Sequence, residues 1–204
     1  MSMKTLRMAL VLAALPALAL AADAAVADKP VAKKAAGVAL KSLSPTVKIL
    51  GDSTMHKWEA NATVLTVTAV VKPGDLLANV KAGALSGLEL AIGVDGLQST
   101  ESKSMDKNMH NAMESDKAPQ ITFSLTSYTV DGDNVAAKGS LSIHNVAKDV
   151  ELKGVLTAKD GVVTVKGSYD LLMSDYGVKP PVMMLGTVKV KDLVTIAYQF
   201  DLAK

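Results

Sequence analysis

The chain has 204 residues, with 22 Lys and Arg against 20 Asp and Glu, and it contains no cysteine. The lack of cysteine excludes disulfides, thiolate metal sites, a thiol nucleophile and a lipid-modified cysteine anchor. Arg7 is the only arginine. Arginine is the preferred side chain for binding phosphate and nucleic acid, because its planar guanidinium donates two parallel hydrogen bonds. Since no basic cluster replaces it, the composition argues against a phosphate-binding site and against a nucleic-acid partner.

The first 21 residues have the pattern of a secretory signal peptide. Lys4 and Arg7 make a positive start, Met8 to Leu20 is apolar, and Ala19-Leu20-Ala21 fits the small-x-small cleavage rule. We therefore expect residues 1–21 to be a signal peptide, with export of the chain and no transmembrane anchor after cleavage. The signal holds two basic residues and no acid, so the mature chain carries equal numbers of each.

Residues 22–43 are rich in Ala, Lys, Val and Pro and show no clear hydrophobic period. Such a composition is typical of a flexible linker between an export signal and a folded domain. A short helix within Lys33 to Lys41 is the alternative for part of this segment. The sequence thus predicts a linker over 22–43 and one domain over 44–204.

From Ser44 onward the hydrophobic period is two, which indicates strands with one apolar face. Asp131-Gly132-Asp133 and Lys159-Asp160-Gly161 have the composition of tight hairpin turns. The expected strands cover residues 47–51, 63–71, 88–94, 120–125, 140–144, 150–156, 163–171 and 194–202, with a short run at 186–191.

A helical period interrupts the strands at residues 102–115. Met105, Met109, Ala112 and Met113 form one apolar stripe, and Pro119 follows the segment. The sequence therefore predicts an all-β fold with one short helix inserted. Many short antiparallel strands fit a barrel or a sandwich, and the tight hairpins favour an eight-stranded antiparallel up-and-down barrel, wide enough to be filled by side chains or to hold one small ligand.

The same alternation fits a transmembrane barrel, because it does not tell which face is inside. Such barrels carry girdles of aromatic residues, whereas this chain has one Trp, four Tyr and two Phe. The inserted amphipathic helix also needs a core on which to pack. Both observations favour a barrel outside the membrane.

The polar residues do not cluster into a recognisable catalytic or metal site. His56, His110 and His144 lack the spacing of a zinc or iron site, and Asp106 with His110 fits a surface ion pair on a helix. No nucleophile elbow, zinc-protease motif or glycine-rich phosphate loop occurs. We therefore expect no enzyme activity, no catalytic residue, no metal and no cofactor.

Methionines gather near the predicted helix and near a rigid turn at 174–184 that contains a Pro-Pro pair. Methionine supplies adaptable apolar surface, so these side chains could roof a cavity for a long apolar molecule, although each could also be core filler. After the turn, residues 194–202 alternate strictly, which predicts a last strand that seals the barrel by pairing with the first. The methionines concerned are Met105, Met109, Met113, Met173, Met183 and Met184.

Four segments, in the same order, resemble motifs of the YceI-like family. Asn145 departs from the family's pattern, where a glycine is expected. The matching segments lie within residues 47–202 and are Gly-Asp-Ser-Thr-Met-His-Lys-Trp-Glu at 51–59, Ser-Met-Asp-Lys-Asn-Met-His at 104–110 with Ala-Pro-Gln-Ile-Thr-Phe at 118–123, Gly-Ser-Leu-Ser-Ile-His-Asn-Val at 139–146 and Asp-Tyr-Gly-Val-Lys-Pro-Pro at 175–181.

This resemblance implies a lipocalin-like barrel in the periplasm that holds a polyisoprenoid or isoprenoid-quinone lipid in an apolar lumen. The alternative is a structural or partner-binding barrel whose lumen is filled by side chains. The oligomeric state stays open, a homodimer included. From period and location, the candidate ligand-binding residues are Trp58, Met109, Met113, Phe123, Leu125, Met173 and Tyr176.

Overall fold

A computed structural model describes residues 37–204 of the chain, so the expected signal peptide and residues 22–36 of the expected linker lie outside the described residues. The described part is a sheet protein with two α-helices, α1 (Leu76–Lys81) and α2 (Lys103–Ala112), and three short 3-10 helices, η1 (Val94–Gly96), η2 (Met173–Tyr176) and η3 (Met184–Gly186). Its strands are β1 (Val38–Ser42), β2 (Thr46–Asp52), β3 (Lys57–Ala62), β4 (Leu65–Val71), β5 (Leu85–Gly93), β6 (Leu97–Ser99), β7 (Gln120–Asp131), β8 (Asn134–Ile143), β9 (Val146–Lys159), β10 (Val162–Leu172), β11 (Val182–Met183), β12 (Val188–Lys189) and β13 (Leu193–Ala203).

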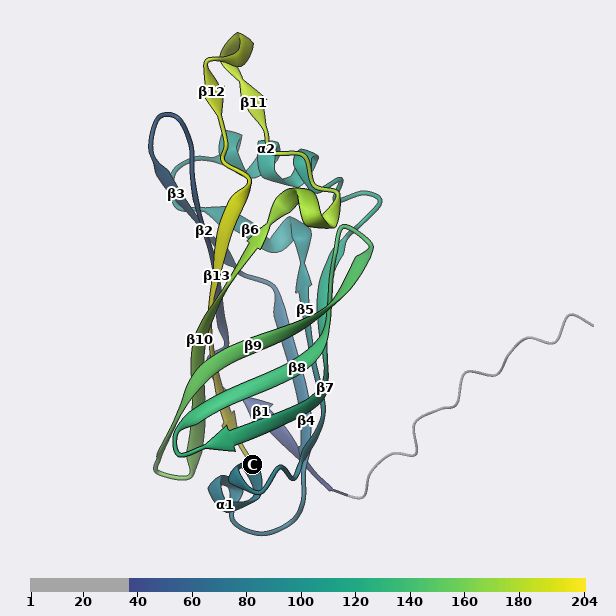
Figure 1. The fold of residues 1–204 in the computed structure, drawn as a ribbon, viewed down its shortest axis with the longest axis vertical. Coiled ribbons are helices and arrows are strands. Elements are labelled where there is room, and N and C mark those ends of the chain that lie inside the picture. The colour runs from purple at the N-terminus through teal and green to yellow at the C-terminus, as the bar shows by residue number, and fades with distance from the viewer. Residues whose placement is uncertain (1–36) are drawn as a thin grey trace, which may run out of the picture. The chain divides into compact units, whose positions relative to one another are not determined.

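The main sheet closes into an eight-stranded antiparallel barrel (Figure 1). We call each of the eight positions around the barrel a stave, whether it is made of one strand or of two in succession. The last five staves are single long strands, namely β7, β8, β9, β10 and β13. Each of the first three staves is made of two successive strands: β1 with β2, β3 with β4, and β5 with β6. Neighbours in space are neighbours in the chain, so the predicted up-and-down barrel is confirmed.

The predicted sealing of the barrel by the last strand is also confirmed. One edge of β13 pairs with β10, and its other edge pairs first with β2, where Ile196 lies opposite Ile49. At its end the same edge pairs with β1, where Leu202 lies opposite Ser42. Closure leaves β13 without a free edge, which removes a site for aggregation.

Strand β1 corrects the prediction that residues 22–43 form a linker, and residues 38–41 are not the helix considered as the alternative. β1 pairs with β4 through Val38 and Val71, and Leu40 is buried in the core at the lower end. Five residues are too few to show a period among alanines and lysines, which have weak strand propensity. Pairing with β4 and β13 determines the strand, so the domain begins before residue 44.

Helix α1, at the lower end of the barrel in Figure 1, was not among the elements predicted from the sequence. The Asp75 carboxylate caps this helix by accepting a hydrogen bond from the Ala78 backbone nitrogen at 2.7 Å. Leu76 and Val80 are buried against residues of the barrel wall such as Val71 and Leu156. A six-residue helix presents too few turns for a helical period to appear.

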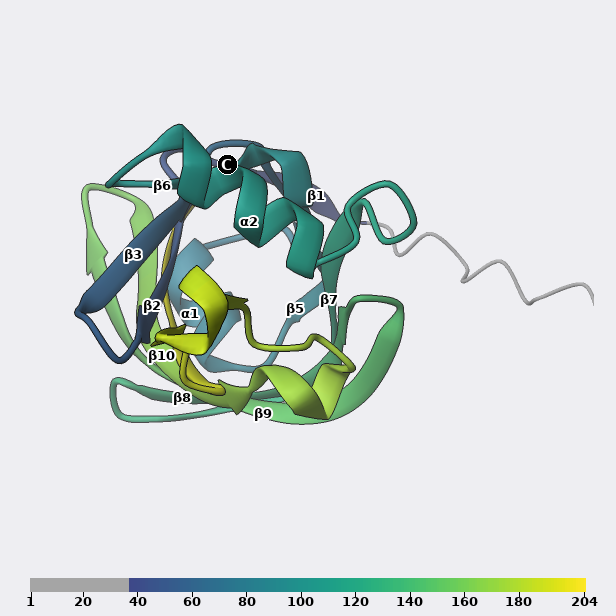
Figure 2. The ribbon, with the colours of Figure 1, turned by 90° about the horizontal axis from the view of Figure 1, so that it is seen from above.

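Helix α2 confirms the helix predicted over 102–115 and lies at one side of the upper end of the barrel in Figure 2. Ser102 caps it by accepting from the Met105 nitrogen at 3.3 Å. The expected ion pair between Asp106 and His110 is wrong. Asp106 accepts from the Ser99 nitrogen at 2.6 Å and the His110 ring nitrogen Nε2 lies 2.8 Å from the Leu97 carbonyl oxygen, so both side chains tie α2 to β6. No helix within residues 37–204 has the length and apolar character needed to span a membrane.

Candidate ligand-binding site

The inner faces of the strands enclose two cavities that follow one another along the barrel. We call the one toward α1 the lower chamber, about 150 Å³, and the one beneath α2 the upper chamber, about 400 Å³. Because native cores are packed at crystal-like density, voids of this size inside a closed barrel are exceptional. The barrel is therefore not filled by its own side chains.

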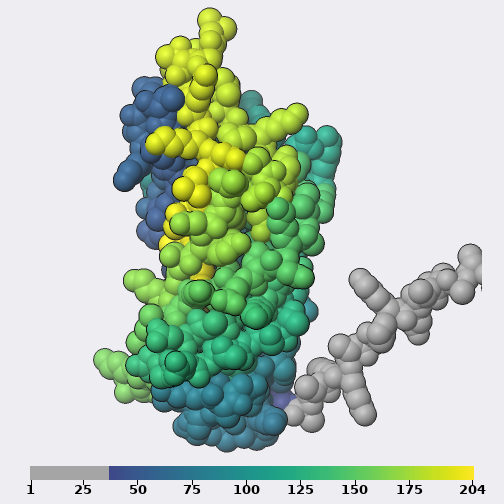
Figure 3. Space-filling model, in the orientation of Figure 1, coloured from purple at the N-terminus to yellow at the C-terminus, as the bar shows by residue number. Residues whose placement is uncertain are grey.

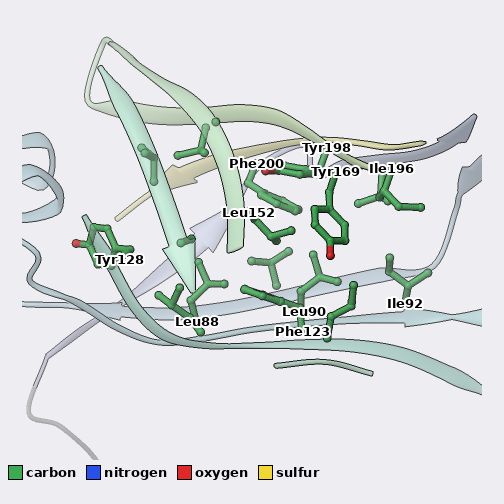
Figure 4. A pocket seen from close by; sticks show the side chains of 18 of the residues that line it. Leu88, Leu90, Ile92, Phe123, Tyr128, Leu152, Tyr169, Ile196, Tyr198 and Phe200 are labelled. Carbon is green, nitrogen blue, oxygen red and sulfur yellow. The ribbon is translucent and has the colours of Figure 1, made fainter. Parts of the chain in front are cut away.

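The lower chamber is lined by aliphatic and aromatic side chains from every stave of the barrel. In Figure 4, Leu88, Leu90 and Phe123 on one wall and Leu152 and Phe200 on the other point toward one another. Tyr198 stacks on Phe200 with ring centroids 5.7 Å apart. A cavity of this size and lining is of the kind that holds a benzene-sized apolar group without water.

Two of the tyrosines that line the lower chamber, Tyr128 and Tyr198, have hydroxyls that bond to the protein backbone. Tyr198 donates to the Lys153 carbonyl at 2.8 Å, and Tyr128 donates to the Val80 carbonyl at 2.8 Å while accepting from the Leu85 nitrogen. Burial raises the pKa of Tyr198 to about 12 and also raises the pKa of Tyr128. Both side chains are thus neutral at physiological pH. Because their hydroxyls already have hydrogen-bond partners, they do not require a polar group on a ligand.

Four isoleucines line both chambers and lie where the two meet. This isoleucine collar is formed by Ile49 of β2, Ile121 of β7, Ile143 of β8 and Ile196 of β13. Isoleucine is branched at Cβ and stiff at χ1, so these four side chains form a rigid apolar boundary between the chambers. A ligand that occupies both chambers has to pass through it.

The upper chamber has a softer wall that is rich in methionine. Met105 and Met109 of α2, its C-cap Met113, and Met173 of η2 contribute to this wall. Met183 and Met184 contribute from the segment around η3. Since methionine has three rotatable bonds and a polarizable sulfur, this wall is suited to an apolar ligand of variable shape.

Two hydrogen-bond donors lie buried at the upper chamber without a partner. The indole Nε1 of Trp58 and the hydroxyl of Tyr176 make no hydrogen bond within the described part of the chain. Tyr176 is only 2% exposed. Burial is the main cause that raises the pKa of its hydroxyl to about 12, and the neighbouring Tyr169 and Asp175 raise the pKa further, so the hydroxyl keeps its proton. Buried donors are rarely left unpaired, which makes this pair the outstanding polar feature of the lumen.

Trp58 is held in place by a glycine on the neighbouring strand. Gly51 lies directly opposite Trp58 in the pairing of β2 with β3. A Cβ atom at Gly51 would lie 2.1 Å from the indole ring, far inside van der Waals contact. The indole of Trp58 therefore packs directly on the Gly51 backbone, and its position depends on the absence of a side chain at residue 51.

Two pairs of polar side chains lie at or next to the upper chamber, and His56 and Glu101 are part of its lining. His56 Nδ1 lies 3.3 Å from the Glu101 carboxylate, and both side chains are partly exposed. Lys191 donates to the Asp52 carboxylate at 2.7 Å, which lowers the pKa of Asp52. The side chains that line the upper chamber include no lysine and no arginine.

The structure places all seven candidate residues of the sequence analysis around the two chambers. Trp58, Met109, Met113, Met173 and Tyr176 line the upper chamber, and Phe123 and Leu125 line the lower one. Sequence reasoning missed the isoleucine collar and Tyr198. The signal was present, because Ile196 and Tyr198 share the alternating face of the last strand, but alternation alone does not tell at what height along the barrel a residue lies.

Comparisons with known proteins agree with this architecture. A family model described as YceI-like domain matches residues 42–202. BcnA from Burkholderia cenocepacia has a TM-score of 0.63 at 16% identity, over 78% of this chain and 96% of that chain. A polyisoprenoid binding domain from Saccharophagus degradans, implicated in plant cell wall breakdown, has a TM-score of 0.59 at 12% identity, over 81% and 97%.

The Campylobacter jejuni YceI protein has a TM-score of 0.56 at 18% identity, over 71% of this chain and 84% of that chain. At such identities these likenesses concern the fold alone. No curated protein sequence matches the chain. The family model, however, spans most of the sequence, and the chain belongs to the YceI-like domain family.

Proposed function

We propose that this protein binds an amphiphilic isoprenoid lipid in its lumen and carries or sequesters it in the periplasm. The observation that carries the proposal is the pair of chambers: a wholly apolar one at depth, joined through the isoleucine collar to one that holds two unpartnered donors. The likeness in fold to a domain that binds polyisoprenoids supports the same ligand class. The periplasmic location rests on the predicted signal peptide and on the family.

Burial of the chain supplies the affinity in this proposal. Each CH₂ group removed from water contributes about 0.8 kcal/mol, so an apolar tail binds strongly without any polar recognition. A branched isoprenoid tail is suited to a lumen walled by Leu, Ile and Phe side chains. The residues at the lower chamber act by excluding water and by shape, and the proposed role requires no chemical step.

The upper chamber favours a neutral headgroup that accepts hydrogen bonds. Trp58 Nε1 and the Tyr176 hydroxyl are donors, and their unpaired state disappears if a ligand oxygen accepts from them. A phosphate or diphosphate headgroup would need cations, and no lysine or arginine lines the chamber. We therefore propose a ligand with carbonyl or ether oxygens, such as an isoprenoid quinone, over an isoprenoid phosphate.

The direct test is native mass spectrometry of the exported protein after purification without detergent. We expect a mass above that of the polypeptide by the mass of one lipid, released by organic extraction and identified by fragmentation. Apo protein that also fails to bind added isoprenoid quinone would contradict the proposal and would favour the barrel as a structural or partner-binding module.

Replacing Tyr176 with phenylalanine separates the headgroup role from stability. The Tyr176 hydroxyl has no protein partner in the described region, so the melting temperature of lipid-free Tyr176→Phe should equal or exceed that of wild type. Its affinity for an isoprenoid quinone should fall about three- to tenfold, the value of one hydrogen bond of roughly 1 kcal/mol. Titration of quinone by quenching of Trp58 fluorescence measures this.

Tyr198→Phe is the matched control. Its hydroxyl donates to the Lys153 carbonyl, so this variant should lose roughly 1 kcal/mol of stability and keep its headgroup affinity. A Tyr176→Phe protein that is destabilised as Tyr198→Phe is, with unchanged quinone binding, would show that Tyr176 has a structural role only.

A further inference from the structure

The connection between β10 and β13 projects beyond the upper end of the barrel. We call residues 181–190, which contain β11, η3 and β12, the rim arm; it forms the uppermost part of the molecule in Figures 1 and 3. Its tip is apolar and exposed. Val182 is 61% exposed, Met184 is 72% exposed, and the side chain of Leu185 is fully exposed.

The backbone at the tip makes this exposure more unusual. Met184 has φ 50° and Leu185 has φ 53°, both in the left-handed region, and Gly186 follows with φ 94°. Glycine and asparagine adopt this conformation at far lower cost than a large apolar residue does. A turn that only had to reverse the chain would carry those residues. Here, Met184 and Leu185 occupy the outermost position, although large apolar side chains are unfavourable both in the left-handed backbone region and in contact with water.

The arm is held in place at its base by the turn between β2 and β3. The Thr54 nitrogen donates to the Lys189 carbonyl at 3.0 Å, and the Thr54 hydroxyl donates to the Thr187 carbonyl at 3.1 Å. The Lys189 nitrogen in turn donates to that hydroxyl. Met55, which is exposed, follows Thr54 in this turn. The tip is therefore carried on a braced hairpin and not on a free loop.

Three lysines lie near the apolar tip, and two of them have no acidic partner among the described residues. Residues 176–191 contain Lys179, Lys189 and Lys191 and no carboxylate. Lys191 pairs with Asp52, whereas Lys179 and Lys189 have no carboxylate within 4 Å in the part of the chain that the structure describes. Exposed apolar side chains beside free lysines are typical of segments that enter the interface of an anionic bilayer, where the lysine stems lie along the headgroups.

We propose that the rim arm is a membrane-docking element that inserts Met184 and Leu185 into the surface of an anionic lipid bilayer. A protein partner fits less well, because a stable interface needs about 800 Å² on each side and the tip is a narrow hairpin. Met183, Met184 and Val188 of the same arm line the upper chamber. Docking would thus bring the chamber's opening to the lipid surface; this last step rests on the proposed function.

The test is binding of the mature protein to vesicles of phosphatidylglycerol and phosphatidylcholine, measured by flotation. We expect Met184→Asn with Leu185→Asn to weaken binding about tenfold or more, because two apolar side chains no longer leave water. Asparagine tolerates the left-handed region, so the melting temperature should not fall. Lys179→Gln with Lys189→Gln should weaken binding to anionic vesicles only.

Val155→Thr is the control, since Val155 is an exposed apolar residue on β9, outside the arm. It should bind vesicles as wild type does. Wild-type protein that does not float with vesicles, or an arm variant that binds undiminished, overturns the proposal. Native mass spectrometry of the wild type keeps the two proposals apart: lipid in the lumen without vesicle binding contradicts docking alone, and vesicle binding without lumen lipid contradicts the lipid-carrier function alone.

Discussion

Ala137→Phe should reduce the lipid retained in the lumen at least tenfold while leaving the barrel folded. Ala137 lies on β8 and lines the lower chamber, between Tyr128 and Leu152 on the neighbouring strands. A phenyl ring there would take up space comparable to the whole chamber of about 150 Å³. The tail would lose room for several CH₂ groups at about 0.8 kcal/mol each, and two of them already correspond to roughly a tenfold loss.

The measurement is the fraction of lipid-loaded protein in native mass spectra, with the melting temperature of the lipid-free form beside it. Val155→Phe adds the same ring to the outward face of the adjacent strand β9 and should retain lipid as wild type does. Undiminished retention in Ala137→Phe would show that the tail does not enter the lower chamber. Equal losses in both variants would point to a general effect of the added ring.

Gly51→Ala should destabilise the protein by about 1–3 kcal/mol, the usual cost of forcing extra volume into a packed site. The new methyl group would lie 2.1 Å from the Trp58 ring, so the indole has to move from its position beside the upper chamber. Trp58 is the only tryptophan, and its fluorescence therefore reports the displacement without a label. We expect a lower urea midpoint and a shifted emission maximum in the same variant.

Gly93→Ala is the matched control on β5. A Cβ atom at Gly93 meets only Val64, at 3.6 Å, which is ordinary contact. Its stability should stay within about 0.5 kcal/mol of wild type, with unchanged Trp58 emission. If Gly51→Ala behaves in the same way, the indole does not depend on Gly51 for its position.

The long elements of this protein could be read directly from local patterns. Strict alternation predicted the last strand, turn-forming residues located the hairpins at 131–133 and 159–161, and an apolar stripe predicted α2. Each signal extends over enough residues, or contains sufficiently distinctive turn chemistry, to stand alone. The resemblance of four ordered motifs then indicated the family, and the alternating faces pointed to residues that line the lumen.

Only the tertiary structure decided how the first three staves are divided and what the barrel encloses. β1 and α1 are short segments that owe their conformation to pairing and burial against residues distant in the chain, so their own residues carry little signal. The isoleucine collar brings together side chains from β2, β7, β8 and β13. Alternation determines which face of a strand is inside, but the height of each residue along the barrel depends on strand register, which is set only when the sheet closes.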